Sequence, residues 1–547
     1  MKSTFDEKKT KKTKRHGAAL AFVASLAVVA IAALSSRADD GQAGSVRLDV
    51  TKHVLGNGMR ILLVSRPDAP VVATYLRFGV GGVDDPKGQT GIAHLLEHMM
   101  FKGTETFGTT DYEAEKPLLT RLDALWGELD AERLKEKSPF AKPNAEKTKK
   151  LEEEIAAVTA EHKKFVVKDE LWQCYQRCGG TSLNASTGND STQYYVQLPA
   201  NQLEVWMKLE SDRIAHPVFR EFYSERDVVH EERRLRTDTQ PRGLFGEAFQ
   251  ATAYQAHPYR QPVVGWSPDI DATVRSEVLD YFKTYYAPNN CIAAIVGDID
   301  VPKTVALFEQ YFGPIPAKPA PRRNITEEPE QKGERRVTMT VDASPQVQIA
   351  WHVPAEGHPD SYALSVASRV LTGSGGGGFG RGRRGGGGGG GGTGRFEKQL
   401  VLAKKVALNA FAFARPGLYP GLFTVSGTPA PGRSLDELEA ALSAEVNRLA
   451  AEPPTADELA RVRNAISAQA IRSLGSNMGI ARAISEAEAI AGDWRYVDVD
   501  RERLKAVTAD DVVRVVKKYL TKDNRTVGHI VGTRSSGFGP ARPEAGQ

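Results

Sequence analysis

Residues 88–104 read GQTGIAHLLEHMMFKGT, and this stretch carries the strongest structural and chemical pattern in the chain. Its apolar residues predict a short, largely buried helix. His94 and His98 are four residues apart, so on a helix their imidazoles lie on one face and can reach the same ion. Glu97 follows His94 by three residues on that side, where its carboxylate can meet a water molecule held by the ion.

The residue types of this helix favour zinc chemistry. Two neutral imidazoles and a carboxylate suit Zn²⁺ and leave a fourth position for water. The ion lowers the pKa of that water towards ~7, and a nearby glutamate can take its proton as it attacks a carbonyl. The order H-x-x-E-H inverts the usual H-E-x-x-H of zinc proteases. The alternative is a solvated helix with two surface histidines, but Leu95, Leu96 and Met99 make the surroundings of the motif apolar.

Further motifs follow in chain order: Asn184-Ala185-Ser186-Thr187 with Asp190, Thr192 and Tyr194, then Glu225 to Glu232, His257-Pro258-Tyr259, Gly265, and Tyr286 to Asn290 with Gly297-Asp298. Together with residues 88–104, they resemble the pitrilysin/insulinase family of zinc peptidases, which includes the mitochondrial processing peptidase. The resemblance extends over residues 52–533. It implies a zinc metalloendopeptidase that cleaves peptides or unfolded polypeptides and holds one Zn²⁺ per chain.

By position, the resemblance implies three sets of site residues: the metal ligands His94, His98 and Glu232, the catalytic residues Glu97 and Glu225, and the substrate-binding residues Asn184, Ala185 and Thr187. Glu97 would be the general base, and Glu225 falls at the auxiliary acidic position of the family. Glu231 is the rival third ligand. On a helix, Glu225 and Glu232 lie two turns apart on one face, whereas Glu231 points about a quarter-turn away. This spacing favours Glu232.

Two segments of the chain resemble each other. Residues 277–298 and 511–533 each predict an amphipathic helix, a polar turn and a strand that ends near a glycine. Any helix–turn–strand pair would share some of these features, but the two segments close the two halves of the chain in the same order. We therefore expect the α+β fold class, with two homologous domains that each pack an antiparallel-rich sheet with helices.

The predicted boundaries follow from this duplication. Strands are expected at Val54–Asn57, Met59–Val64 and Val71–Val80, and again at Arg336–Val341 and Val347–Val353. The domains are a catalytic domain at 46–313, a linker at 314–332, a second domain without a zinc site at 333–535 with a Gly-rich loop at 373–394, and a tail at 536–547. The helical spacing within Leu118–Lys168 predicts a helical-hairpin insert, at about 113–180, which lengthens the distance from His98 to Glu232.

The second half has no H-x-x-E-H motif. In the family that the chain resembles, this half commonly carries an Arg followed seven residues later by a Tyr, and these groups hold the substrate backbone. Here Val401 and Leu408 align with them, and neither side chain can donate a hydrogen bond. One explanation is another mode of substrate binding or a displaced alignment; the other is a related zinc-less subunit. The expected partner is thus a second copy or such a subunit.

The first 38 residues resemble a targeting segment. Basic residues precede the apolar run Ala18–Leu34, and Ser36-Arg37-Ala38 forms a small-x-small cleavage site. We expect export to the bacterial periplasm. The apolar run has 17 residues, at the short limit for a membrane span, so a retained inner-membrane anchor is the alternative.

Net charge and cysteine content limit the remaining classes of function and partner. The formal net charge is +4, but residues 1–38 hold eight Lys/Arg against Asp6 and Glu7, so the rest of the chain is slightly acidic. This balance argues against a nucleic-acid partner for the Gly/Arg-rich run. The three cysteines, Cys174, Cys178 and Cys291, exclude a disulfide framework but leave packed thiols, one bridge or a soft metal site open. A non-catalytic assembly subunit is the rival function, although such subunits typically lose motif residues.

Overall fold

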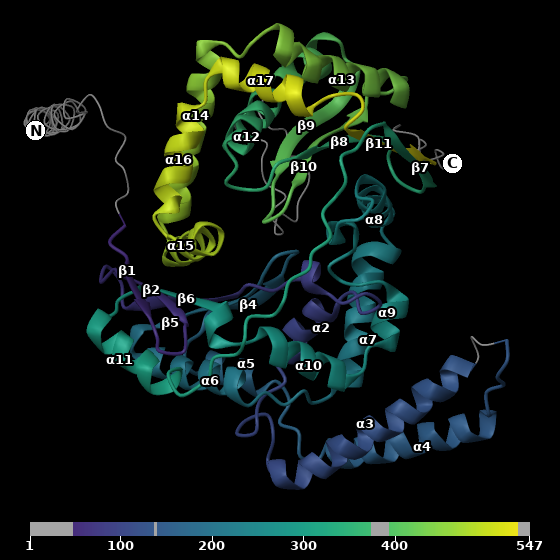
Figure 1. Cartoon of the computed structure of the whole chain (residues 1–547), viewed down its shortest axis with the longest axis vertical. Helices are drawn as coiled ribbons and strands as arrows, with labels where there is room; N and C mark the ends of the chain where they lie inside the picture. Colours follow the sequence, from purple (N-terminus) through teal and green to yellow (C-terminus); the bar gives the residue numbers. More distant parts are fainter. Residues whose placement is uncertain (1–47, 136–138, 374–392, 534–547) are drawn as a thin grey trace, which may run out of the picture. The chain divides into compact units, whose positions relative to one another are not determined.

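The computed structural model describes residues 48–135, 139–373 and 393–533, which form two sheets packed with helices (Figure 1). The predicted α+β class, with two homologous domains and a helical hairpin in the first, is confirmed. The predicted targeting segment, the tail at 536–547 and most of the Gly-rich loop lie outside the described residues. Within the described ranges, no helix is long and apolar enough to cross a membrane.

The strands are β1 (Thr51–Val54), β2 (Arg60–Ser65), β3 (Val71–Phe78), β4 (Thr181–Thr187), β5 (Thr192–Pro199), β6 (Cys291–Gly297), β7 (Arg335–Val341), β8 (Gln346–Val353), β9 (Ala407–Arg415), β10 (Gly421–Pro429) and β11 (Arg525–Gly532). The helices before β7 are α2 (Ile92–Met99), α3 (Tyr112–Leu134), α4 (Ala145–His162), α5 (Glu170–Arg177), α6 (Leu203–Ala215), α7 (Phe222–Arg233), α8 (Pro241–Ala253), α9 (Ser267–Ala272), α10 (Arg275–Tyr285) and α11 (Val301–Tyr311). The later helices are α12 (Pro359–Thr372), α13 (Leu435–Ala451), α14 (Ala456–Leu474), α15 (Asn477–Ala491), α16 (Tyr496–Ala506) and α17 (Ala509–Tyr519).

The two sheets share one topology. The first has the strand order β1-β2-β6-β3-β5-β4, and the second has the order β7-β11-β8-β10-β9. In each sheet the last strand of the domain lies between two early strands, β6 between β2 and β3 and β11 between β7 and β8. It is parallel to the earlier of the two, and all other neighbours are antiparallel. Strands β2, β6, β3, β5 and β4 therefore correspond to β7, β11, β8, β10 and β9. Only β1 has no counterpart among the described strands.

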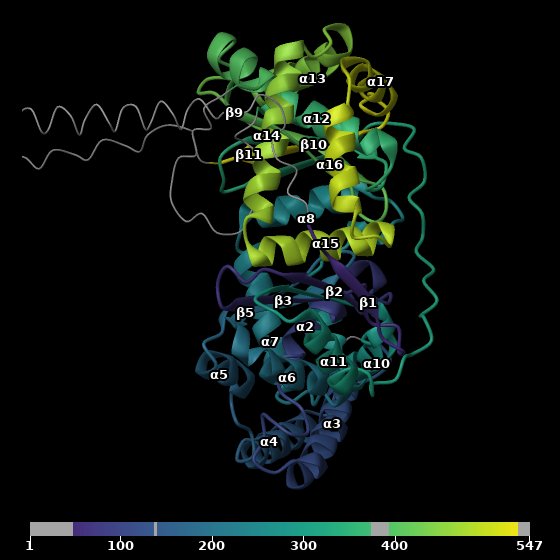
Figure 2. The same cartoon turned by 90° about the vertical axis from the view of Figure 1, so that its left-hand side faces the viewer.

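The core of the first domain lies between its sheet and a layer of helices, among them α2, α6, α10 and α11 (Figure 2). The central strand β6 is buried along its whole length, as its apolar sequence CIAAIVG requires. Leu95, Leu96 and Met99 of α2 belong to this core. The helix that carries the predicted metal ligands is thus held by apolar packing.

The first strand differs from its prediction. Strand β1 covers Thr51–Val54, whereas the sequence placed a strand at Val54–Asn57. Leu55 instead begins the turn, because its carbonyl accepts a hydrogen bond from the N–H of Gly58. Strand β1 is exposed on both faces and therefore lacks the alternation of apolar and polar residues that marks a half-buried strand. The sequence pattern placed the strand at the nearest apolar residues, Val54 and Leu55, instead.

Helices α3 and α4 run side by side as the hairpin (Figure 1). Leu122, Leu125, Leu129, Leu151 and Ile155 pack between them in a small core of their own. Helix α5, which the sequence included in the insert at about 113–180, is different. Its Leu171 and Tyr175 are buried in the core of the first domain, so the hairpin ends with α4.

Candidate metal centre

The N-terminus of α2 is fixed by a glycine and a carboxylate. Gly91 has φ +89°, and a Cβ there would lie 2.5 Å from the carbonyl oxygen of Val264, so only glycine fits. The carboxylate of Asp85 accepts hydrogen bonds from the N–H groups of Gly91 (2.7 Å) and Ala93 (3.2 Å). These bonds satisfy N–H groups that have no partner within the helix. Burial raises the pKa of Asp85 well above its usual value and outweighs these hydrogen bonds, which lower it.

A buried arginine fixes the C-terminal end of α2. Nε of Arg213, on α6, donates to the carbonyl oxygen of Met100 at 2.8 Å. The guanidinium is balanced by Glu210, whose two carboxylate oxygens lie 2.7 Å from Nη1 of Arg213. Both ends of the motif helix are therefore held by groups from other elements.

Three candidate metal ligands come together from α2 and α7. One donor atom from each of His94, His98 and Glu232 lies within 4.8 Å of the other two. Nε2 of His94 is 3.6 Å from Oε1 of Glu232, and Nε2 of His98 is 3.4 Å from its Oε2. Two imidazoles and a carboxylate are a donor set that suits zinc.

Glu225 contacts His98 from the side opposite to Glu232. Its Oε1 lies 3.0 Å from Nδ1 of His98, and its Oε2 lies 2.5 Å from Nζ of Lys102. Burial by itself would raise the pKa of Glu225, but the hydrogen bonds from His98 and Lys102 outweigh it and hold the pKa below its usual value. A carboxylate at Nδ1 favours a proton on that nitrogen and leaves Nε2 of His98 available to a metal.

The carboxylate of Glu97 is buried beside the end of strand β4. The hydroxyl of Thr187 donates to its Oε2 at 2.6 Å. Thr187, predicted to bind substrate, therefore also orients Glu97. The side-chain oxygen of Asn184 accepts from the N–H of Ala185 at 2.8 Å. All three predicted substrate-binding residues lie on β4, which forms the edge of the first sheet opposite to β1.

The two glutamates that compete for the third ligand position point to different partners. Glu231 is exposed and pairs with Arg234 at 2.6 Å. Glu232 faces the histidines and also forms an ion pair with Arg236, from the π-helical segment Arg234–Asp238. The geometry thus brings Glu232, and not Glu231, to His94 and His98.

Several residues that organise the centre were not predicted from the sequence: Asp85, Lys102, Arg213 and Arg236. Lys102 stands next to the motif, but its partner Glu225 is more than a hundred residues away. Asp85 precedes the helix by several residues and caps it across a loop. No local signal marks these residues, because even Asp85 lies six residues before the N-cap Gly91 and not at the capping position itself.

Two family models match the chain. One, described as Insulinase (Peptidase family M16), matches residues 60–118 and 163–266. The other, described as Peptidase M16 inactive domain, matches residues 273–466, so that together they cover more than half of the chain. The chain belongs to the M16 (insulinase/pitrilysin) peptidase family. The resemblance seen in the motifs is confirmed.

Relatives of this M16 chain carry peptidase names. It is 26% identical over 482 residues to zinc protease PqqE of Helicobacter pylori, covering 86% of this chain and 90% of that protein. It is 24% identical over 473 residues to the probable mitochondrial-processing peptidase subunit beta of Arabidopsis thaliana, covering 85% and 75%. A solved structure of a protease from Helicobacter pylori matches with a TM-score of 0.69 at 23% identity, covering 88% and 100%, which shows the shared fold.

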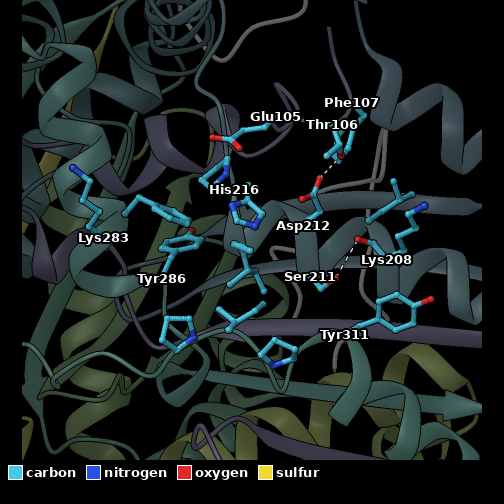
Figure 3. Close-up of a pocket in the computed structure, with 18 of the residues that line it drawn as sticks. Glu105, Thr106, Phe107, Lys208, Ser211, Asp212, His216, Lys283, Tyr286 and Tyr311 are labelled. Carbon is cyan, nitrogen blue, oxygen red and sulfur yellow. Dashed lines mark hydrogen bonds between the residues drawn. The ribbon is translucent and has the colours of Figure 1, made fainter. Parts of the chain in front are cut away.

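Two other features of this M16 chain lie apart from the motif helix. A hollow of about 1160 Å³ is lined by residues of α6, α10 and α11, and it includes none of the predicted site residues (Figure 3). In the second domain, Asp436, Glu439 and His529 also bring possible ligand atoms within 4.8 Å. There Arg336 donates to both oxygens of Glu439, at 2.6 and 2.9 Å, so that carboxylate already has a cationic partner.

Proposed function

We propose that this chain is a zinc-dependent endopeptidase that hydrolyses peptides or unfolded polypeptides and holds one Zn²⁺. The observation that supports it is the convergence of His94, His98 and Glu232, with donor atoms within 4.8 Å, beside Glu97 on the same helix as the histidines. Membership of a peptidase family and relatives named zinc proteases support the same reading.

The residues that are present fit a zinc ion, and each group has a separate role. A zinc ion held by His94, His98 and Glu232 would supply Lewis acidity towards water and the scissile carbonyl. Glu97 takes the proton from the attacking water and passes it to the leaving amine. The hydroxyl of Thr187 holds the Glu97 carboxylate in orientation through its 2.6 Å hydrogen bond.

We infer that substrate binds as an added strand beside β4. Strand β4 is an edge strand of the first sheet, and it ends at Thr187, which contacts Glu97. An extended peptide that adds to this edge would gain main-chain hydrogen bonds and pass beside the catalytic carboxylate. Because backbone groups supply the affinity, the substrate is expected to be an unfolded segment with only a weak sequence preference.

The alternative is a non-catalytic assembly subunit. The match of residues 273–466 to the inactive M16 domain favours this role for the second half of the chain. The first half retains Glu97 and the three candidate ligands, which a purely structural subunit does not need. The two functions differ in one measurable property, which is hydrolysis that depends on Glu97.

The test compares Glu97→Gln with Glu231→Gln, an exposed glutamate on α7 that points away from the histidines. Zinc content and cleavage of an unstructured peptide are measured for the purified chain. We expect Glu97→Gln to retain zinc while kcat falls by at least about a hundredfold, because only the base is removed. Glu231→Gln should match the wild type. Near wild-type cleavage by Glu97→Gln would refute the assigned base.

We also propose that the active unit contains a second chain, either a copy of this one or a related chain without zinc ligands. Leu408 is half exposed on the edge strand β9, and Val401 lies in the π-helical segment Glu397–Ala403. Neither side chain can hydrogen-bond a substrate carbonyl. Purification from the native host would identify a companion chain; a fully active homodimer would exclude the division of labour.

Export to the periplasm is proposed from the basic and apolar pattern of residues 1–38, with an inner-membrane anchor as the alternative. N-terminal sequencing of the protein from the cell envelope distinguishes the two. A start near Asp39 indicates cleavage, whereas an intact chain in the membrane indicates an anchor. An intact chain in the cytoplasm would refute export.

A further inference from the structure

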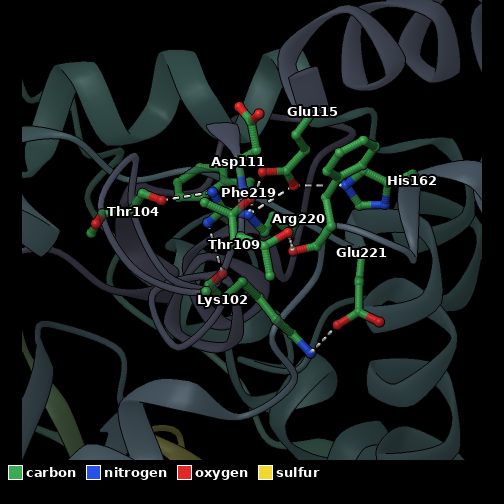
Figure 4. Close-up of polar contacts among 12 residues, drawn as sticks. Lys102, Thr104, Thr109, Asp111, Glu115, His162, Phe219, Arg220 and Glu221 are labelled. Carbon is green, nitrogen blue, oxygen red and sulfur yellow. Dashed lines mark hydrogen bonds and ion pairs between the residues drawn. The ribbon is translucent and has the colours of Figure 1, made fainter. Parts of the chain in front are cut away.

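Most of the α3–α4 hairpin lies outside the family pattern, since the M16 model matches residues 60–118 and 163–266 and omits 119–162, although Glu115 in the first turns of α3 falls inside the match. Its base is nevertheless built into the first domain through buried polar contacts (Figure 4). These contacts centre on Arg220, which is 1% exposed and precedes α7 by two residues. A buried guanidinium of this kind is stable only when its charge and its N–H groups all have partners.

Arg220 binds the segment that follows the motif helix. Its Nη2 donates to the carbonyl oxygen of Thr104 at 2.6 Å, and its Nη1 lies 3.3 Å from the carbonyl oxygens of Lys102 and Phe107. The planar guanidinium therefore fixes the path of residues 102–107, which leave the C-terminal end of α2. A lysine could not replace this set of bonds, because its single ammonium cannot reach three carbonyls and a carboxylate in one plane.

The hairpin supplies the counter-charge. Nε of Arg220 donates to both carboxylate oxygens of Glu115, on α3, at 2.8 and 2.9 Å. Nε2 of His162, at the end of α4, lies 2.8 Å from Oε1 of the same carboxylate. Burial would raise the pKa of Glu115, but the hydrogen bond with His162 and the charge of Arg220 hold it below its usual value. Both helices of the hairpin thus meet at one ionised, buried carboxylate.

The same contacts lead to the candidate metal centre. Lys102, whose carbonyl faces Arg220, extends its ammonium group to Glu225 at 2.5 Å and to Glu221 at 3.8 Å. Glu225 in turn contacts Nδ1 of His98 at 3.0 Å. Arg220 therefore stands where the chain leaving α2 meets the chain entering α7, which are the two helices that carry the candidate ligands.

We propose that Arg220, with Glu115 as its counter-ion, is a positioning residue for the metal centre, and that the hairpin base sets the spacing between α2 and α7. This inference rests on the proposed zinc-peptidase function. It assigns the insert a role in metal affinity and turnover through Lys102 and Glu225, without any contact between the hairpin and substrate.

The test compares two buried glutamates of the same helix. Glu115→Gln removes the counter-charge of Arg220. Glu132→Gln is the matched control, because Glu132 is 1% exposed and accepts hydrogen bonds from Nζ of Lys135 and the N–H of Asn144, both at 2.6 Å, at the far end of the hairpin. For each variant the full chain is assayed for zinc affinity by chelator competition, for kcat and KM on an unstructured peptide, and for thermal stability.

We expect both variants to unfold at a lower temperature than the wild type. Only Glu115→Gln should weaken zinc binding, by up to about 10-fold, the low end of the loss seen when a direct partner of a ligand is removed, and lower kcat with KM little changed. If Glu115→Gln does not fold, His162→Gln is the milder second variant, because it removes one partner of the carboxylate and leaves Arg220 and Thr109 in place, and it should weaken zinc binding by a smaller factor.

The outcomes separate the two proposals. Wild-type zinc affinity and kcat in a folded Glu115→Gln or His162→Gln chain would overturn the positioning role while leaving the proposed function intact. Equal effects of Glu115→Gln and Glu132→Gln on zinc affinity would also overturn it, because the cause would then be general loosening of the hairpin. A wild-type chain that binds no zinc would refute the proposed function, and this inference with it.

Discussion

The two domains of this chain share the order of five strands. They differ in the helix that follows strand β3 in the first domain and the corresponding strand β8 in the second. After β3, the first domain places α2, an eight-residue helix with His94, Glu97 and His98. After β8, the second domain places α12, a fourteen-residue helix that reads PDSYALSVASRVLT and is largely buried. The same scaffold thus carries a candidate metal site in one copy and apolar core in the other.

This difference shows that fold and site depend on separate residues. The shared topology is maintained by buried apolar strands and by turns that need glycine. The candidate site depends on a few polar residues of α2, α7 and β4. In the second domain the polar contacts of α12 serve stability, since Asp360 accepts from Lys518 at 3.0 Å and from the Tyr519 hydroxyl at 2.7 Å, and also pairs with Arg514.

The largest effect is expected from the candidate ligands. His98→Ala and Glu232→Ala should each lose zinc and lower kcat/KM by at least about a thousandfold, or ~4 kcal/mol of transition-state stabilisation. His529→Ala is the matched variant in the second domain, where His529 also lies in a group of possible ligands. It should leave the zinc content at one ion per chain. A loss of zinc from His529→Ala would place a metal in both domains and break the comparison.

The next largest effect concerns two glycines in corresponding positions at the ends of β6 and β11. A Cβ on Gly297 would lie 2.2 Å from the carbonyl oxygen of Val71, and one on Gly532 would lie 2.1 Å from that of Ala343. Gly297 also has φ +148°, a conformation that other residues rarely adopt. Gly297→Ala should therefore cost about 2–4 kcal/mol and Gly532→Ala about 1 kcal/mol less.

Thermal or denaturant unfolding measures both variants. A cost of less than about 0.5 kcal/mol, which is typical of neutral surface substitutions, would show that the strand ends can move apart easily. Equal losses of stability at the two positions would instead show that the close approach to a carbonyl causes the destabilisation, and that the backbone conformation of Gly297 adds little. Either result sharpens the comparison between the copies.

The smallest effect is expected at Asp360. Burial alone would raise its pKa, but hydrogen bonds from Tyr519, Arg514 and Lys518 hold it well below the usual value for aspartate. Asp360→Asn should destabilise the second domain by about 1–3 kcal/mol, because charged hydrogen bonds are lost and the two cationic partners are partly exposed. Asp523→Asn, at an exposed turn, is the control.

The lowered pKa of Asp360 also sets a direction for pH dependence. Its stabilising contribution is complete above the unfolded-state pKa of about 4 and is lost as the pH falls below that value. The stability difference between the wild type and Asp360→Asn should therefore shrink between about pH 4 and pH 2. A difference that stays constant over this range would contradict the assigned ion pairs.

The sequence predicted those parts of the molecule that local spacing determines. The i,i+4 histidines, the two-turn separation of Glu225 from Glu232 and the hairpin all follow from helical periodicity. Contacts between distant segments could not be predicted, such as those of Lys102 with Glu225 and of Thr187 with Glu97. Strand β1 was misplaced because it is exposed, and α5 was joined to the insert because its amphipathic pattern does not say which core it packs against.

The strand order has a consequence for the order in which the chain can fold. In both sheets a buried interior strand, β6 or β11, is the last one made during synthesis, yet it pairs with strands made early: β6 with β2 and β3, and β11 with β7 and β8. Until residue 297 has emerged, β2 and β3 lack the neighbour that each needs, and their apolar edges are open to wrong partners. Each sheet therefore closes late, through contacts that are distant in sequence, and folding of this topology is expected to be slow and to expose aggregation-prone strands.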